Sequence, residues 1–222
     1  MAYSLGLTLY NLSNRREAGV AIDRPLRPAG PLAWLHAPTA EAARSMLELA
    51  RRLTEEDGVS VVMTCPATLP PRAGVLHQPP PVDSPTEARA FLEHWRPEAV
   101  IFSEGELRPA MLAELIERKL PLIMVGARSP YFLKERDGWY PGLMRGLLAE
   151  FRTILTLDEP SARAFRKAGA AISAFAARDY AQMIYDLAVR RELISLGRDI
   201  AAAAAKVEIE NEPKEQIIEA EQ

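Results

Sequence analysis

Short apolar runs alternate along this chain with longer segments in which apolar residues recur every three or four positions. The runs fit buried strands and lie at residues 31–37, 58–64, 74–77, 98–102, 121–125, 153–157 and 171–175. The longer segments fit helices and lie after residue 39, after residue 84, and at 107–119, 141–151 and 158–169. This alternation predicts an α/β fold, with a Rossmann-like, mostly parallel, doubly wound sheet and right-handed crossovers.

The two ends of the chain depart from this pattern. Residues 1–26 form a separate N-terminal segment, in which apolar residues at 3–12 precede two arginines. The segment is too short to span a bilayer, and its charges follow the apolar part, unlike those of a signal peptide. Two interpretations stay open: an element packed on the domain, or an anchor in the membrane interface.

Residues 27–177 make up the predicted α/β domain, and a C-terminal extension follows it. Residues 178–206 indicate one long helix, and residues 207–222 are acidic and expected to be flexible. The apolar positions Met183, Leu187 and Ile194 of this helix need cover. Either the helix packs back on the sheet, or it docks a partner or forms a homodimer with a second copy.

Composition narrows the range of partners. The chain has 222 residues, of which 48% are hydrophobic and 26% charged, as in ordinary globular proteins. Its net charge of −3 gives no reason to expect nucleic acid as a partner. The one cysteine, Cys65, suits a reducing cytoplasm. The three histidines lack metal-ligand spacing and no glycine-rich phosphate loop is present, so we expect neither a metal nor another cofactor.

The most informative motif follows the apolar run at 98–102 and reads Ser-Glu-Gly-Glu-Leu-Arg-Pro at 103–109. It places Glu104 and Glu106 between a strand and a helix, at the edge where ligands bind in open α/β sheets. Carboxylates there also lie near the positive end of the helix dipole. The alternative is that both are helix-start acids that only cap and solubilise.

The motif resembles Glu-x-Glu-Leu-Trp-Pro of the 3-deoxy-D-manno-octulosonic acid (Kdo) transferases, bacterial glycosyltransferases of lipopolysaccharide synthesis. Other segments are similar to this family in the same order. They are Arg-Pro-Ala-Gly at 27–30 and Trp-Leu-His-Ala at 34–37, the threonine-containing turn at 64–68, Pro-Val-Asp at 81–83, Gly-Ala-Arg-Ser at 126–129, and the stretch at 158–170. The resemblance covers residues 27–170 and rests on this shared order more than on any one motif.

The resemblance implies a role in lipid A–Kdo synthesis. Members of the family have a GT-B fold, in which the N-terminal half holds the lipid acceptor and the base, and the C-terminal half binds CMP-Kdo. A chain of 222 residues has room for one such half with extensions. We therefore expect an acceptor half that transfers no Kdo alone and needs a donor domain from a partner chain. The alternative is a binding or scaffolding relative that keeps the acceptor site without catalysis, and the weakest alternative is an unrelated Rossmann-like module.

The base of the family is the glutamate of Ser-x-Gly-Glu, shortly after His-Ala, and here its counterpart is ambiguous. Counted strictly from His36, the base falls on Ala42. With one residue deleted, Thr39 matches the serine and Glu41 the base, and we prefer this alignment. Neither alignment keeps the glycine. Without the resemblance, Glu41 is a first-turn acid that favours the helix dipole.

The resemblance also implies a set of substrate-binding residues: His36, Thr39, Thr64, Thr68, Glu104, Glu106, Arg128 and Ser129. Two alternatives stay open, because a histidine that closes a buried strand is often structural, and Arg128 can pair with Glu104 or Glu106. Arg108 stands where the family has tryptophan. We expect four of them, Thr64, Glu104, Glu106 and Arg128, to meet Glu41 at the carboxyl edge of the sheet.

The implied partner is a lipid A precursor. The family uses an N-terminal amphipathic helix at the membrane, and residues 3–12 with the following arginines suit an anionic bilayer surface. We therefore expect a cytoplasmic protein that associates peripherally with the inner face of the cytoplasmic membrane.

Overall fold

The computed structural model describes residues 4–13, 24–132 and 140–170. All of these belong to the first of two units, Met1–Phe175 and Ala176–Gln222. The predicted strand at 171–175, the predicted helix at 178–206 and the predicted tail at 207–222 lie outside the described residues.

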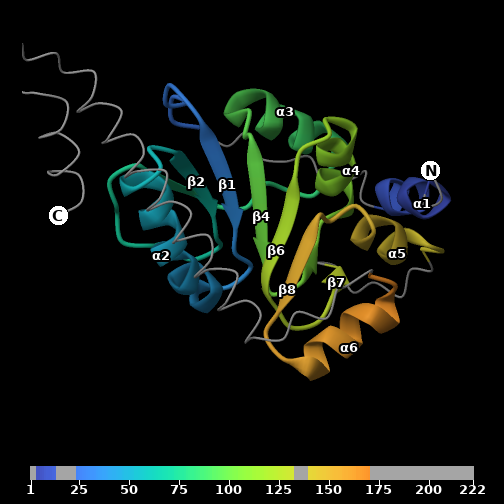
Figure 1. The fold of residues 1–222 in the computed structure, drawn as a ribbon. Helices are drawn as coiled ribbons and strands as arrows, with labels where there is room; N and C mark the ends of the chain where they lie inside the picture. The colour runs from blue at the N-terminus through green and yellow to red at the C-terminus, as the bar shows by residue number, and fades with distance from the viewer. Residues whose placement is uncertain (1–3, 14–23, 133–139, 171–222) are drawn as a thin grey trace, which may run out of the picture. The chain divides into compact units, whose positions relative to one another are not determined.

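A six-stranded parallel sheet forms the centre of the described domain (Figure 1). In the order β3-β2-β1-β4-β6-β8, its strands are Val75–Gln78, Ser60–Thr64, Leu32–His36, Ala99–Ser103, Leu122–Ala127 and Thr153–Thr156. The chain first builds outward from β1 to β3 and then crosses to the other side of β1 with β4. This order confirms the predicted doubly wound fold and places a topological switch point between β1 and β4.

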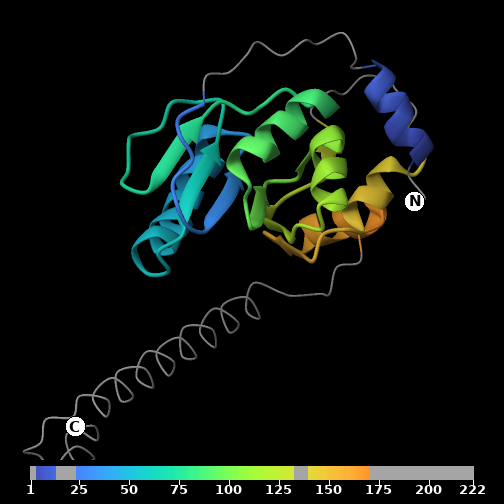
Figure 2. The ribbon, with the colours of Figure 1, turned by 90° about the horizontal axis from the view of Figure 1, so that it is seen from above.

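Helices cover both faces of the sheet (Figures 1 and 2). They are α2 (Ala40–Glu55), α3 (Pro85–Trp95), α4 (Pro109–Glu117), α5 (Leu143–Leu148) and α6 (Glu159–Ala168). Because successive strand residues point to opposite faces, neighbours such as Trp34 and Leu35 enter different cores. Trp34 packs in the core under α3, α4 and α5, whereas Leu35 packs in the core under α2. Burial on both faces explains why the strands are apolar runs rather than alternating ones.

Side-chain caps begin three of the predicted helices. The side chains of Thr39, Ser84 and Asp158 accept backbone N–H groups at the starts of α2, α3 and α6. Gly169 ends α6 with a positive φ of 100°. These caps fix where each helix leaves the sheet, and Thr39 thereby becomes part of the carboxyl edge.

The segment before α4 differs from the prediction. The expected helix at 107–119 is shorter, because α4 begins at Pro109 and the residue before a proline disfavours helical geometry. Glu106–Leu107 instead form β5, which pairs with β7 (Tyr131–Phe132) in a small second sheet. Glu104 and Glu106 therefore precede the helix, and the helix-start interpretation is wrong for both. The predicted helix at 141–151 is likewise shorter than expected, because α5 spans only Leu143–Leu148.

The N-terminal segment contains a helix, α1 (Ser4–Ser13), that contacts α4 and α5. Tyr10 is 1% exposed and Leu7 packs against the core. The opposite side carries Leu5, Leu9 and Leu12, which are 62%, 38% and 59% exposed. One side of α1 thus agrees with the interpretation that the N-terminal segment packs on the domain. The other side of α1 is an exposed apolar stripe. Within the described ranges, no helix has the length and apolar character to cross a membrane.

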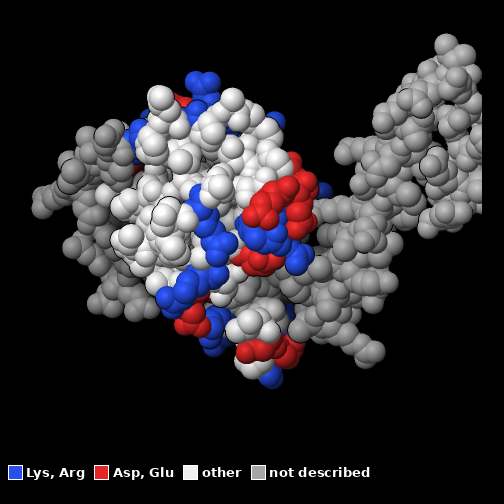
Figure 3. Space-filling model, turned by 90° about the vertical axis from the view of Figure 1, so that its left-hand side faces the viewer, with Lys and Arg blue, Asp and Glu red and all other residues white. Residues whose placement is uncertain are grey.

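The exposed face of α2 carries charges of both signs. Arg51 forms ion pairs with Glu48, Glu55 and Glu56. Figure 3 shows blue and red side chains interleaved on the side of the domain that carries this helix. Opposite charges at helical spacing solubilise a surface helix. This cluster is therefore a solvated face of α2.

Candidate functional site

Two residues meet across the switch point of the sheet. Thr39 follows β1 and Glu104 follows β4. The hydroxyl of Thr39 accepts the backbone N–H of Ala42 at 3.1 Å and donates to Oε1 of Glu104 at 3.1 Å. Its single proton is therefore committed to the carboxylate. The contact joins the ends of two adjacent strands, at the position where doubly wound folds bind ligands.

Glu41 and Arg128 lie at the same edge. A guanidinium nitrogen of Arg128 lies 3.9 Å from Oε1 of Glu41, and the two side chains are 60% and 76% exposed. A pair at this distance in water is weak. Arg128 also reaches Glu104, but through its backbone N–H, which donates to the carbonyl oxygen of Glu104 at 2.8 Å. The alternative of a side-chain pair with Glu104 or Glu106 is not what the structure shows.

The turn that carries Glu104 has little freedom. Glu104 has a φ of 64° and Gly105 a φ of 130°. A Cβ at Gly105 would lie 2.1 Å from the carbonyl oxygen of Ser129, so only glycine fits. The carbonyl oxygen of Gly105 accepts the N–H of Tyr131 at 3.0 Å. These contacts hold the loops after β4 and β6 together. They also keep Glu104, a non-glycine residue, at a positive φ, as often happens at functional sites.

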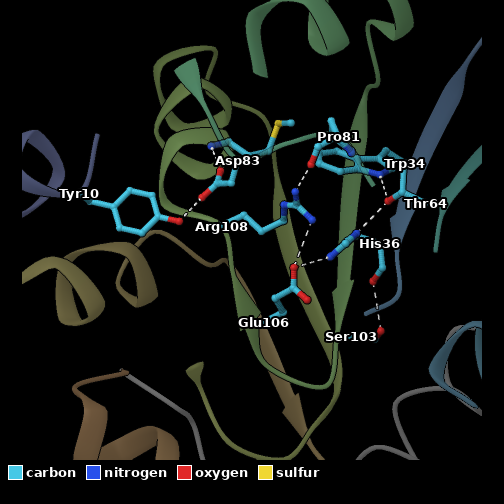
Figure 4. A network of polar contacts seen from close by, with 10 residues as sticks. Tyr10, Trp34, His36, Thr64, Pro81, Asp83, Ser103, Glu106 and Arg108 are labelled. Atoms are coloured by element: carbon cyan, nitrogen blue, oxygen red, sulfur yellow. Dashed lines mark hydrogen bonds and ion pairs between the residues drawn. The ribbon is translucent and has the colours of Figure 1, made fainter. Parts of the chain in front are cut away.

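A chain of buried hydrogen bonds lies behind this edge (Figure 4). Nε1 of Trp34 donates to Oγ1 of Thr64 at 2.9 Å, and His36 contacts that oxygen through Nδ1 at 2.8 Å and Glu106 through Nε2 at 3.1 Å. Because a carboxylate only accepts, Nε2 carries the proton, and Thr64 donates to Nδ1 of the neutral ring. Burial lowers the pKa of His36, which favours this neutral form.

Arg108 closes this chain on the other side of Glu106. It is 2% exposed, and it donates to Oε1 of Glu106 at 3.2 Å and to the carbonyl oxygen of Pro81. Burial by itself raises the pKa of Glu106, but the hydrogen bond from His36 and the charge of Arg108 outweigh it, so that this pKa is lowered. Glu106 is therefore a buried, ionised carboxylate between a neutral donor and a cation.

Asp83 connects the same region to α1. The hydroxyl of Tyr10 donates to Oδ2 of Asp83 at 2.7 Å, and the N–H of Met111 donates to Oδ1 at 2.9 Å (Figure 4). Burial raises the pKa of Asp83. The aspartate thus joins α1 to the start of α4. The Pro-Val-Asp motif is the sequence signal for Asp83, and no motif points to its partner Tyr10.

The predicted site residues fall into three groups. Thr39, Glu41, Glu104 and Arg128 gather at the carboxyl edge, and we call them the switch-point site. A second group, His36, Thr64 and Glu106, is buried behind that edge, where its members form hydrogen bonds with one another. This burial agrees with the alternative that His36 is a structural residue at the end of a buried strand. Thr68 and Ser129 are exposed in the loops after β2 and β6. Within the described part of the chain, no cluster of three or more histidine, cysteine, aspartate or glutamate side chains could hold a metal.

The sequence motifs and this arrangement agree with a comparison against known families. The family model described as 3-deoxy-D-manno-octulosonic-acid transferase (Kdo transferase) matches residues 12–178. The chain belongs to this family. A protein of Arabidopsis thaliana, described as a probable mitochondrial Kdo transferase, is 32% identical over 145 residues, and the match covers 61% of this chain. It covers 32% of the plant protein, so the chain spans about a third of the length of that relative.

Two solved structures match part of this chain with low scores. S. aureus MnaA in complex with UDP matches with a TM-score of 0.44 and 13% identity, over 64% of this chain and 42% of that protein. A Listeria monocytogenes protein described as a putative UDP-N-acetylglucosamine 2-epimerase matches with a TM-score of 0.41 and 14% identity, over 64% of this chain and 43% of that protein. The fold of this Kdo transferase family domain is defined by its own strand order.

Proposed function

We propose that this domain binds the sugar acceptor of Kdo transfer, a lipid A precursor, and serves lipopolysaccharide assembly. The observation that carries the proposal is the Thr39–Glu104 hydrogen bond across the β1/β4 switch point. It brings polar side chains from two strand ends to the position where α/β folds take ligands. Family membership supplies the chemical class of that ligand.

The switch-point site has groups that suit a sugar acceptor. Carboxylates accept hydrogen bonds from sugar hydroxyls, and Glu41 and Glu104 are both accessible. Arg128 supplies a planar cation that binds phosphate or carboxylate groups well. Its contact with Glu41 is long and exposed, so a ligand can replace it at little cost.

One observation favours the second candidate, a binding relative without catalysis. Thr39 is the N-cap of α2, and it matches the serine of Ser-x-Gly-Glu in both alignments. We favour the count without a deletion inside the helix, in which the counterpart of the base is Ala42, which is 6% exposed. A buried alanine accepts no proton. If Kdo transfer occurs, another carboxylate must take that proton, and the sugar donor must bind to a donor-type domain.

We further propose that α1 holds the domain peripherally at an anionic membrane surface, the inner face of the cytoplasmic membrane. Leu5, Leu9 and Leu12 are exposed on one side of α1, at spacings of four and three. Tyr10 anchors the other side through Asp83. A donor-domain chain, and a second copy that pairs through residues 178–206, are the further partners that we propose.

Calorimetric titration tests the acceptor proposal. The probe is the deacylated disaccharide of a lipid A precursor, because it carries the sugar groups without acyl chains that would bind α1. We expect saturable binding to the full chain. We also expect Arg128→Gln to weaken it severalfold, and Arg51→Gln, in the solvated cluster of α2, to leave it unchanged. Lack of binding by the wild-type chain would contradict the proposal.

A further inference from the structure

The β1/β4 switch point has three glutamates at or near it, Glu41, Glu104 and Glu106, and their surroundings differ enough to assign one of them to the ligand. Glu106 is the first to be set aside. It is 3% exposed, and one of its oxygens accepts from both His36 and Arg108. A ligand that displaced either partner would leave a buried charge without compensation. Glu106 is therefore part of the frame of the site, by which we mean the buried, hydrogen-bonded residues behind the carboxyl edge.

Glu41 is accessible but loosely held. It lies in the first turn of α2, with a side chain 76% exposed, and its contact with Arg128 is 3.9 Å long. No other hydrogen bond or ion pair of its carboxylate occurs within the described residues. A side chain in this state loses its conformational freedom when a ligand binds, and that cost reduces affinity.

Glu104 is both accessible and held in place. Its carboxylate is partly buried and accepts from Thr39, whose proton has no other acceptor. Its backbone N–H donates to Val125 at 3.3 Å, and its carbonyl oxygen accepts from Arg128 at 2.8 Å. The positive φ of 64° is thus enforced from both sides. A carboxylate fixed in this way binds a hydroxyl with less loss of entropy than Glu41 does.

We infer that Glu104, and not Glu41, is the carboxylate that accepts the hydrogen bond of the acceptor hydroxyl to which the sugar is transferred. The inference rests on the proposed function and deepens it, because it names the ligand-binding group and its chemistry. Thr39 is a positioning residue that acts through Glu104. In the family, the base is a glutamate on the helix after β1. In this chain, Glu104 in the turn after β4 thereby takes over that role.

The test compares two isosteric variants and two probes by calorimetric titration on the full chain. Glu104→Gln should weaken binding of the deacylated disaccharide about tenfold, the loss expected when a charge-assisted hydrogen bond becomes neutral. Glu41→Gln should weaken it clearly less than Glu104→Gln does, because the carboxylate of Glu41 is loosely held. A disaccharide that lacks the receiving hydroxyl should bind the wild-type chain about tenfold more weakly, and binding to Glu104→Gln should lose little further, because the two changes remove one interaction.

Thr39 supplies a second, independent measurement. Thr39→Val removes the proton that orients Glu104 and should weaken binding severalfold, whereas Thr39→Ser keeps the hydroxyl and should restore it. Thermal melts show whether Thr39→Val still folds after losing the cap of α2. Wild-type affinity in Glu104→Gln, or a larger loss in Glu41→Gln, would overturn the inference alone. A wild-type chain that binds neither disaccharide would instead contradict the proposed function on which it rests.

Discussion

Glu104 and Glu106 lie two positions apart in one motif and have opposite surroundings. Glu106 points inward, is 3% exposed, and is bonded to His36 and Arg108. Glu104 lies at the edge of the sheet, where Thr39 is its hydrogen-bond donor. Gly105 separates them with a turn that no other residue fits. The comparison shows that one glutamate of the motif fixes the frame of the site and the other is presented to solvent.

The inner region should matter most for stability, and Arg108→Ala is its strongest test. The variant leaves Glu106 buried and ionised without its cation, so we expect a loss of about 3–5 kcal/mol in the free energy of unfolding. Urea denaturation measures this loss. The matched control is Arg51→Ala, which removes an arginine from exposed ion pairs and should leave the midpoint unchanged. A similarly small effect of both variants would contradict the claim that buried Arg108 stabilises the domain more than exposed Arg51 does.

Tyr10→Phe should have the next largest effect, because it leaves one oxygen of buried Asp83 without its donor. We expect a loss of about 1–3 kcal/mol in the free energy of unfolding. The control is Tyr131→Phe, whose hydroxyl forms no hydrogen bond within the described residues. If the two variants are equally stable, α1 is not anchored through Asp83.

The pH dependence of stability gives a smaller effect. Burial lowers the pKa of His36, so the unfolded chain binds a proton near pH 6.5 that the folded chain does not. The contribution of neutral His36 to the free energy of unfolding is therefore fully present above pH 6.5. Between pH 6.5 and 5.5, protonation of this histidine in the unfolded chain should lower the free energy of unfolding by up to about 1.4 kcal/mol. Urea midpoints across this range measure the slope. His36→Gln should flatten this slope, and an equal slope in the wild-type chain and in the variant would contradict a buried neutral His36.

The outer side of α1 should affect membrane binding and not stability. Replacing Leu5, Leu9 and Leu12 together by serine removes the exposed apolar stripe, and we expect severalfold weaker flotation with anionic liposomes. Leu26→Ser is the control, because Leu26 is 92% exposed outside α1. Unchanged flotation in the triple variant would remove the membrane role of this helix.

The sequence predicted the frame of the domain better than the roles within it. The strands β1, β2, β4 and β6 are apolar runs because helices cover both faces of the sheet. Three of the predicted helices follow residues 39, 84 and 158, where the structure has the side-chain caps of α2, α3 and α6. The sequence could not separate Glu104 from Glu106, because the difference arises from the turn at Gly105 and from β5. Nor could it place Tyr10 on Asp83, because that contact joins residues 73 positions apart.

Amide chemical shifts during titration with the deacylated disaccharide test the central claim most directly, since they locate the ligand on the domain. We predict that the shifts concentrate at residues 39–42, 104–106 and 127–129, and that the charged end of α2 around Arg51 stays unchanged. Saturable shifts confined to another part of the domain, or no shifts at all, would contradict a binding site at the β1/β4 switch point.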